Sequence, residues 1–468
     1  MITSRSIYEK RKSGDLDGAY KDALDLKESG SIDELGFNAL AWCLYSLIDR
    51  DLKKENINSL RVKTYLMEYL KLPLEKKPSL VHSHILRLAL KLAKENNSLN
   101  MLEFIRIWGI ENFSEEDYES YKIPNGKEIP SLVERVILQA SKDASETNNS
   151  DLHNYIYPHL EEAIKRFPKN IWLTWRKAKI LVVMGKTDEA FILVSDFTKS
   201  KGDHYWVWEF LGDISDDCSL SCYCKALLCN PDDDFSPKVR VKLAQLLSNI
   251  DEYSAAKYEI DKVITNKTKN GYQIPDDVNQ MTSQKWYLTA KSVDSNLQFY
   301  KSNVEKAESL VFTNIPWVDA NLGNTFEFKK IEGKPQRSLR NLYIKDSSSK
   351  YPKEVRVLNS KKFKSYEIGQ ALKIKGEFEK KSKFNLYLVD KRPDSLSWDL
   401  FEQKEFSDRL RVQNNMGFTK DNIFIPPPLI TANNLQDGET WSGLALKMYD
   451  QKKKKLGWKA ISINRRDI

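Results

Sequence analysis

Apolar side chains recur at intervals of three to four residues through about the first 312 residues, where strand-like alternation is nearly absent. This period aligns the apolar positions along one stripe of a helix. Short turns are followed by a small residue where two helices would approach closely, as at Ala19, Ala190 and Ala255. The pattern predicts an all-α region built from stacked helix pairs.

We expect two parts in this helical region, 1–140 and 151–312, because a polar run at 141–151 interrupts the periodic pattern. A last helix pair, 277–290 and 295–312, is predicted to end the stack.

The pattern changes at Asn314, after which apolar and polar residues alternate in short runs separated by turn residues. Such alternation is typical of half-buried strands. Five runs predict a first barrel of the OB type over 314–392, and a second small barrel is predicted over 404–468. The predicted fold is therefore multidomain, an α-solenoid followed by two all-β barrels. The five runs are 326–328, 342–344, 355–357, 372–375 and 384–388.

In the second barrel, alternation places Ile423 and Ile425 on one face of a strand and Phe424 on the other. A small barrel buries the two isoleucines, which leaves the Phe424 ring facing solvent. Met416 and Phe418 share a face a short turn upstream. Outward aromatic rings surrounded by cations are typical of small barrels that bind single-stranded nucleic acid, because bases stack on the rings.

Cations suited to phosphate contacts surround these rings in the sequence. A lysine-rich turn lies near the C-terminus, and the first barrel adds two lysines directed outward from one strand. A tryptophan in a small barrel is more often core, yet Trp458 and Trp441 are further candidates for stacking. The predicted phosphate contacts are Arg411, Lys452, Lys453, Lys454, Lys455, Lys459, Lys373 and Lys375.

Charge is unevenly divided along the chain. Residues 314–468 carry 31 Lys and Arg against 19 Asp and Glu, a net charge of +12, whereas the residues before them carry a net −4. This asymmetry favours a polyanion-binding C-terminal third. A solvated lysine-rich surface without a ligand explains the charge by itself equally well.

Catalytic and metal-binding patterns do not stand out. The five histidines all lie in the helical region outside any recognisable catalytic motif, and no phosphate-binding loop, dinucleotide fingerprint or zinc-protease motif occurs. Four cysteines crowd between 218 and 229, but their spacings predict buried small side chains and not a zinc site. We therefore expect a non-enzyme without cofactor, metal or disulfides.

We also expect a cytoplasmic protein that does not enter a membrane. The N-terminus leads straight into charged residues, and the longest apolar run, 39–48, is too short to span a bilayer.

The helical region resembles tetratricopeptide repeats. The marks are the small, aromatic and proline positions of that family, and they are clearest between Pro158 and Ile264. The resemblance implies helix pairs that stack on one another and present a groove to a protein partner. The matching positions include Gly185, Ala190, Trp208, Leu211, Gly212, Ala226 and Pro231.

The second barrel resembles cold-shock-type OB domains. That family carries a Gly-Phe strand, an Asp-x-Phe-x strand and an acidic-Gly turn, which this chain supplies at 417–418, 422–425 and 437–438. Met416 stands where the family usually has a second exposed aromatic residue, and Pro426 stands where a histidine is common. Both departures weaken the expected stacking.

Taken together, the parts resemble accessory proteins of bacterial TOTE conflict systems, which are mobile-element and anti-phage loci. The matching marks are 317–321, 369–372, 421–428 and 457–459. The resemblance implies a nucleic-acid-binding accessory that works with effector proteins encoded nearby.

The predicted function is an adaptor that binds single-stranded RNA or DNA through its barrels and a protein partner through its helices. A scaffold whose barrels bind protein remains an alternative, and an enzyme with a non-obvious site is a third. The sequence does not separate RNA from DNA, because both offer stackable bases.

Overall fold

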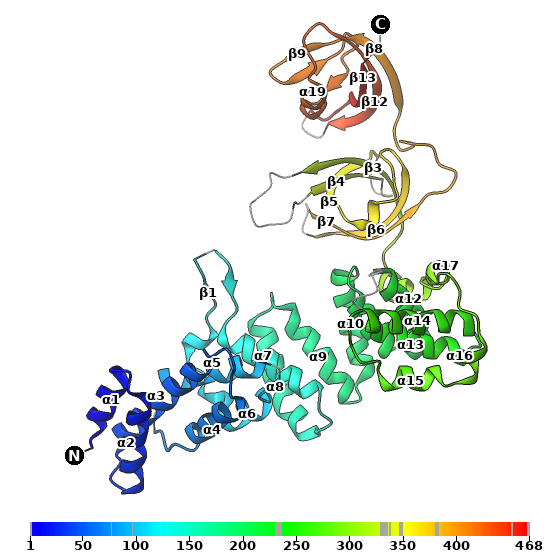
Figure 1. The fold of residues 1–468 in the computed structure, drawn as a ribbon. Coiled ribbons are helices and arrows are strands. Elements are labelled where there is room, and N and C mark those ends of the chain that lie inside the picture. The colour runs from blue at the N-terminus through cyan, green and yellow to red at the C-terminus, as the bar shows by residue number, and fades with distance from the viewer. Residues whose placement is uncertain are drawn as a thin grey trace. The chain divides into compact units, whose positions relative to one another are not determined.

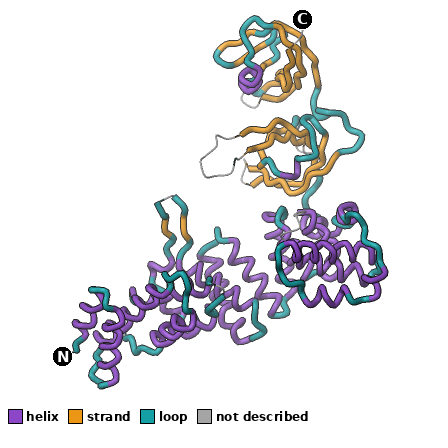
Figure 2. The backbone as a smooth tube through the Cα atoms, in the orientation of Figure 1, coloured by secondary structure: helices purple, strands orange, loops and turns teal. Residues whose placement is uncertain are grey.

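The computed structural model describes residues 2–75, 77–95, 97–124, 126–229, 236–327, 336, 338–345, 350–379, 383–450 and 453–465. The chain divides into two compact units, Met1–Ala307 and Glu308–Ile468. The first unit is helical and the second is rich in strands (Figure 1 and Figure 2).

The helices of the first unit follow one another with short connections. They are α1 (Ser4–Lys12), α2 (Leu16–Glu28), α3 (Glu34–Asp51), α4 (Ser59–Leu70), α5 (Leu80–Lys94), α6 (Met101–Trp108), α7 (Leu132–Ser145), α8 (Ser150–Arg166), α9 (Ile171–Val183), α10 (Thr187–Lys201), α11 (Tyr205–Asp213), α12 (Ser219–Cys229), α13 (Pro237–Asn249), α14 (Tyr253–Lys269), α15 (Asp276–Thr282), α16 (Lys285–Thr289) and α17 (Leu297–Ser302). Short 3-10 turns lie at η1 (Ile110–Asn112), η2 (Glu115–Tyr118) and η3 (Asp216–Cys218).

Local sequence explains where many of these helices begin. Asp15, Asp33 and Asn58 each accept a hydrogen bond from a first-turn backbone N–H of the helix that follows. Ser131 and Glu134 form a reciprocal capping box at the start of α7. Such caps satisfy backbone donors that have no partner inside the helix.

The predicted helix pairs are present. Gly14 and Gly185, both with positive φ, turn α1 into α2 and α9 into α10, and a tight turn at Asp251 joins α13 to α14. Ala19 and Ala190 are fully buried, as expected for small residues where two helices meet. One hydrophobic core cluster runs from Ile7 to Ile180.

Two details of the helical prediction were wrong. Instead of two long helices at 277–290 and 295–312, the structure has four short ones, α15 to α17 and α18 (Glu305–Phe312). A two-stranded hairpin, β1 (Tyr121–Lys122) and β2 (Glu128–Ile129), also interrupts the helical region. Its short exposed strands carry too little alternation to be read from the sequence.

A buried polar network joins the last helices of the first unit. Arg240 Nη1 donates to Glu259 Oε2 at 2.6 Å, and both side chains are almost fully buried. Asn296 Nδ2 donates to Glu259 Oε1 at 2.6 Å, and the Tyr300 hydroxyl contacts the same carboxylate. These bonds compensate for burying the two charges and tie α13 and α14 to α17.

The first sheet of the second unit has five antiparallel strands: β3 (Val318–Glu327), β4 (Ser338–Lys345), β5 (Lys353–Leu358), β6 (Ala371–Glu379) and β7 (Lys383–Lys391). Their order in the sheet is β5-β4-β3-β6-β7, and β5 also contacts β7, so the sheet curls. The 3-10 turn η5 (Lys361–Phe363) connects β5 to β6. The five predicted runs fall on these strands, except that Phe328 lies outside the described residues.

The second sheet contains β8 (Gln403–Arg409), β9 (Arg411–Gln413), β10 (Met416–Phe418), β11 (Phe424–Ile425), β12 (Thr440–Asp450) and β13 (Lys455–Arg465). The strand order is β8-β12-β13-β11-β10-β9. The two edge strands, β8 and β9, are consecutive in the chain and separated only by Leu410. A short helix that the sequence analysis missed, α19 (Pro427–Asn433), follows β11.

Candidate nucleic-acid interface

The predicted alternation around Phe424 is present in the second sheet. Ile423 and Ile425 are fully buried in its core, while Phe424 is half-buried on the other face. The strand is shorter than expected, because Asn422 adopts a positive φ in the turn before it. Such a conformation is tolerated best by glycine and asparagine.

Strand pairing brings four of the predicted site residues into one row. Phe418 on β10 lies opposite Arg411 on β9 and opposite Phe424 on β11. Phe424 in turn lies beside Lys459 on β13. Residues paired in this way share one face of a sheet. We call Arg411, Phe418, Phe424 and Lys459 the aromatic row.

The two rings of the aromatic row form a continuous surface. Their centroids are 5.4 Å apart, with an angle of 46° between the ring planes. Phe418 is 39% exposed, and Met416, two residues earlier on the same strand, is 44% exposed. The row therefore presents two aromatic rings to solvent with a cation at each end, which is the chemistry that stacks bases and contacts phosphates.

The two cations of the row are not equally available. Arg411 is exposed, and no ion pair or hydrogen bond of its side chain occurs among the described residues. Lys459 is half-buried, and its Nζ lies 3.8 Å from Glu354 Oε2 on β5 of the first sheet. Glu354 also accepts a hydrogen bond from Asn341 Nδ2 at 2.9 Å. The sequence carried no signal for Glu354, which is far from Lys459 along the chain.

The lysine turn lies at the end of the β12–β13 hairpin and not in the row. Lys453, Lys454 and Lys455 are exposed, whereas Lys452 lies outside the described residues. Lys455 and Lys459 are four residues apart on β13, a separation of roughly 13 Å along a strand. The turn is therefore within reach of a bound strand of several nucleotides.

The two tryptophans do not belong to the exposed face. Trp441 is a buried member of the core of the second sheet, and Trp458 packs against the same core. Lys447 Nζ lies over the Trp458 ring, 5.7 Å from its centroid. Neighbouring residues on a strand point to opposite faces, so Trp458 points away from Lys459.

The first sheet differs from expectation at one of its two candidate lysines. Leu372 and Ile374 are buried, and Lys373 is exposed on the opposite face, as predicted. Lys375, in contrast, is half-buried and donates to the backbone carbonyl of Phe312 at 2.7 Å. Lys375 is thus held by the segment before β3, and its contact to phosphate stays a prediction.

The outer face of the first sheet is covered around Tyr343 by the segment that links the two sheets. Tyr343, which points outward from β4, is only 6% exposed because it contacts Trp398, Phe401 and Leu446. The linker is held by Asn321, whose Nδ2 donates to Asp399 Oδ1 at 3.1 Å. The ring that β4 directs outward is therefore covered, whereas Phe418 in the aromatic row of the second sheet is exposed.

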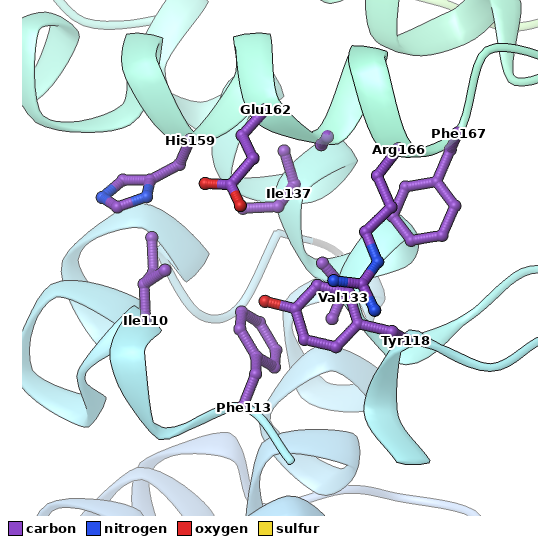
Figure 3. Close-up of a pocket in the computed structure, with 10 residues that line it drawn as sticks. Ile110, Phe113, Tyr118, Val133, Ile137, His159, Glu162, Arg166 and Phe167 are labelled. Carbon is purple, nitrogen blue, oxygen red and sulfur yellow. The ribbon is translucent and has the colours of Figure 1, made fainter. Parts of the chain in front are cut away.

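A small cavity in the helical unit is shown in Figure 3. Its volume is about 20 Å³, enough for a water molecule but not for a substrate. The guanidinium carbon of Arg166 lies over the Tyr118 ring, 3.8 Å from its centroid. Burial lowers the pKa of His159. Packing and a cation–π contact account for this arrangement.

The cysteines and other possible metal ligands form no site in the described part of the chain. Cys222 and Cys224 are buried, and the five cysteines form no disulfide with one another. No group of three or more His, Cys, Asp or Glu residues there is arranged to hold a metal ion.

No described helix combines the length and apolarity that crossing a bilayer requires.

Comparison with known families identifies two regions. Residues 404–463, which contain the aromatic row, match the S1/CSD-like domain 2 of the TOTE conflict systems. Residues 171–307 match a domain of unknown function, DUF7017. No curated protein matches the chain. The second sheet is thus similar to a domain found in TOTE systems, which confirms the cold-shock-like and TOTE resemblance for that part of the chain.

Proposed function

We propose that the chain is a non-enzymatic adaptor of a bacterial conflict system. In this proposal the second sheet binds single-stranded nucleic acid and the helical unit binds a protein partner. The observation that carries the proposal is the aromatic row, because it lies inside the residues that resemble the TOTE domain. An anti-phage role is part of the same proposal and rests on that resemblance.

The strand orders support OB barrels for both sheets. The first sheet, numbered by its own strands, reads 3-2-1-4-5, with strands 3 and 5 in contact. In the second sheet β8 and β9 act as two halves of one first strand, which gives the order 1-2-3-5-4-1. This is the order of a closed five-stranded Greek-key barrel.

In the proposed mechanism, bases stack on the aromatic rings and the cations contact the phosphates. One base would stack on Phe418 and a neighbouring base on Phe424, since their rings are adjacent. Arg411 would contact the phosphate at one end of the row and Lys459 the phosphate at the other. Duplex bases are already stacked on each other, so this surface favours single strands.

The helical unit supports a different partner. Its sequence resembles tetratricopeptide repeats, and stacks of such helix pairs bind peptides or helices along a groove. Residues before Asn314 carry a net charge of −4, which does not favour nucleic acid. We infer that the partner is a protein, encoded near this chain's own gene.

The main alternative is a scaffold or regulator whose sheets bind protein. It would use the same exposed rings as an apolar contact and would not depend on phosphate.

A titration of the full chain with single-stranded and duplex oligonucleotides of equal length distinguishes the two functions. We expect single strands to bind more tightly, with log affinity falling by roughly 0.7 per contacted phosphate for each unit of log salt.

Absence of nucleic-acid binding at low salt, or an affinity that does not respond to salt, would support the scaffold.

The protein partner is tested separately by capture from the native host with residues 1–307 or residues 308–468 deleted. We expect deletion of the helical unit to abolish capture and deletion of the strand-rich unit to preserve it. The reverse result would assign the partner to the sheets.

A further inference from the structure

A polar opening lies in the first sheet, away from the covered region around Tyr343. It occupies about 700 Å³ between β4 and the segment around η5. Arg340 has the same strand parity as Leu342 and Ile344, which are core residues, so it points to the inner side of the sheet. The opening is lined by Arg340, Asn359, Ser360, Phe363, Lys364 and Tyr366. We call it the Arg340 cleft.

Arg340 has no counter-ion among the residues that the structure describes. Its Nη1 donates to the hydroxyl of Thr325, but its Nε is buried without a hydrogen-bond partner. Burial lowers the pKa of Arg340, although a guanidinium stays protonated at neutral pH. A half-buried cation with one neutral partner is costly, and an anion in the cleft would offset that cost.

The remaining lining suits a phosphate. Lys364 is exposed at the rim and adds a second cation, while Asn359 and Ser360 add an amide and a hydroxyl. Among the described residues, no acidic side chain lines the cleft. Burial, with a smaller contribution from Asp390, raises the pKa of Tyr366. The half-buried Tyr366 offers an aromatic ring beside the cations. Arginine with lysine, polar hydrogen-bond donors and a ring is the combination that recognises a nucleotide phosphate.

We propose that the Arg340 cleft binds a phosphate monoester, supplied either by a free mononucleotide or by the 5′-phosphate at the end of a strand. Arg340 contacts the phosphate with the part of its guanidinium that lines the cleft, and Lys364 adds a second cation to the same ligand. The site is separate from the aromatic row, because it lies on the inner side of a different sheet. Its occupancy therefore does not require binding at Phe418 and Phe424.

The test is calorimetric titration of the full chain with four probes. They are inorganic phosphate, adenosine 5′-monophosphate, and one short oligonucleotide carrying either a 5′-phosphate or a 5′-hydroxyl. Arg340→Gln removes the charge, and Lys364→Gln removes the rim cation with little risk to the fold. Arg356→Gln is the matched control, because Arg356 is exposed on neighbouring β5, where it lies over the Phe326 ring, 5.1 Å from its centroid.

We expect Arg340→Gln to weaken phosphate-monoester binding roughly ten- to hundredfold, as loss of a charged hydrogen-bond partner does. Lys364→Gln should weaken it less, and Arg356→Gln should leave it unchanged. Tighter binding of the mononucleotide would identify a free nucleotide, whereas dependence on the oligonucleotide's 5′-phosphate would identify a strand end. Phe418→Ala should preserve binding of the mononucleotide even where it abolishes strand binding.

Two results would overturn the proposal. One is absence of binding to inorganic phosphate and to the mononucleotide, together with equal affinity for the 5′-phosphate and 5′-hydroxyl oligonucleotides, by the unmodified chain. The other is an equal loss in the Arg340→Gln and Arg356→Gln variants, which would show a diffuse charge effect. If Arg340→Gln lowers the melting temperature strongly, Lys364→Gln decides the outcome, and unchanged binding in that variant would also count against the cleft.

Discussion

Replacement of Phe418 by alanine separates stacking from packing on the aromatic row. Phe418 is 39% exposed, so its ring already faces water over a large part of its surface. A fully buried phenylalanine costs about 3–5 kcal/mol when it is replaced by alanine, and a ring with this exposure should cost about half of that. Loss of one base–aromatic stack costs roughly 1–3 kcal/mol of binding free energy, which corresponds to about a five- to hundredfold weaker affinity.

The assay measures both quantities on the same variant of the full chain. Affinity comes from fluorescence anisotropy with a labelled single strand, and stability comes from thermal melting. Phe378→Ala is the matched control, because Phe378 is an exposed phenylalanine of the first sheet at 46% exposure, outside the row. Ile423→Ala provides the opposite extreme, since Ile423 is fully buried and its loss should lower stability without removing a contact to nucleic acid.

Unchanged affinity in Phe418→Ala, or an equal loss in Phe378→Ala, would refute the reasoning. Phe424→Ala should give a similar loss of affinity with a larger loss of stability, because Phe424 is less exposed than Phe418. The two effects should not add, since the rings lie 5.4 Å apart and share their ligand.

Three further predictions concern other contacts. Glu354→Gln should raise the affinity for single strands a few-fold in the same anisotropy assay, because it frees Lys459 from a competing carboxylate at 3.8 Å; weaker binding would contradict this. Arg240→Met should lower the unfolding free energy by about 3–5 kcal/mol, measured by denaturant titration, because it leaves Glu259 buried without its cation. Burial lowers the pKa of His82 from 6.5 to about 4. The unfolded chain then binds the proton more readily, so stability should fall as pH drops from about 6.5 to 4, by up to ~3 kcal/mol; His82→Gln should flatten this dependence.

Much of the architecture follows from local pattern. Helical periodicity up to Phe312 and alternation after Asn314 reflect which side chains can be buried on a helix stripe or a strand face, and the division falls close to the boundary at Ala307. The outward direction of Phe424 could be read from its two isoleucine neighbours, because the side-chain period of a strand is two. Short elements such as α15 to α18 were misread, since a few residues carry too little periodicity to fix their length.

Strand pairing, in contrast, was decided by tertiary structure. Phe418 and Phe424 are close in sequence, but Arg411 and Lys459 join them only because β9, β10, β11 and β13 are neighbours in the sheet. The same is true of Glu354 beside Lys459 and of the backbone carbonyl that binds Lys375. The contacts of each cation depend on segments that are far apart in the chain. Composition alone therefore does not predict which cations are already paired.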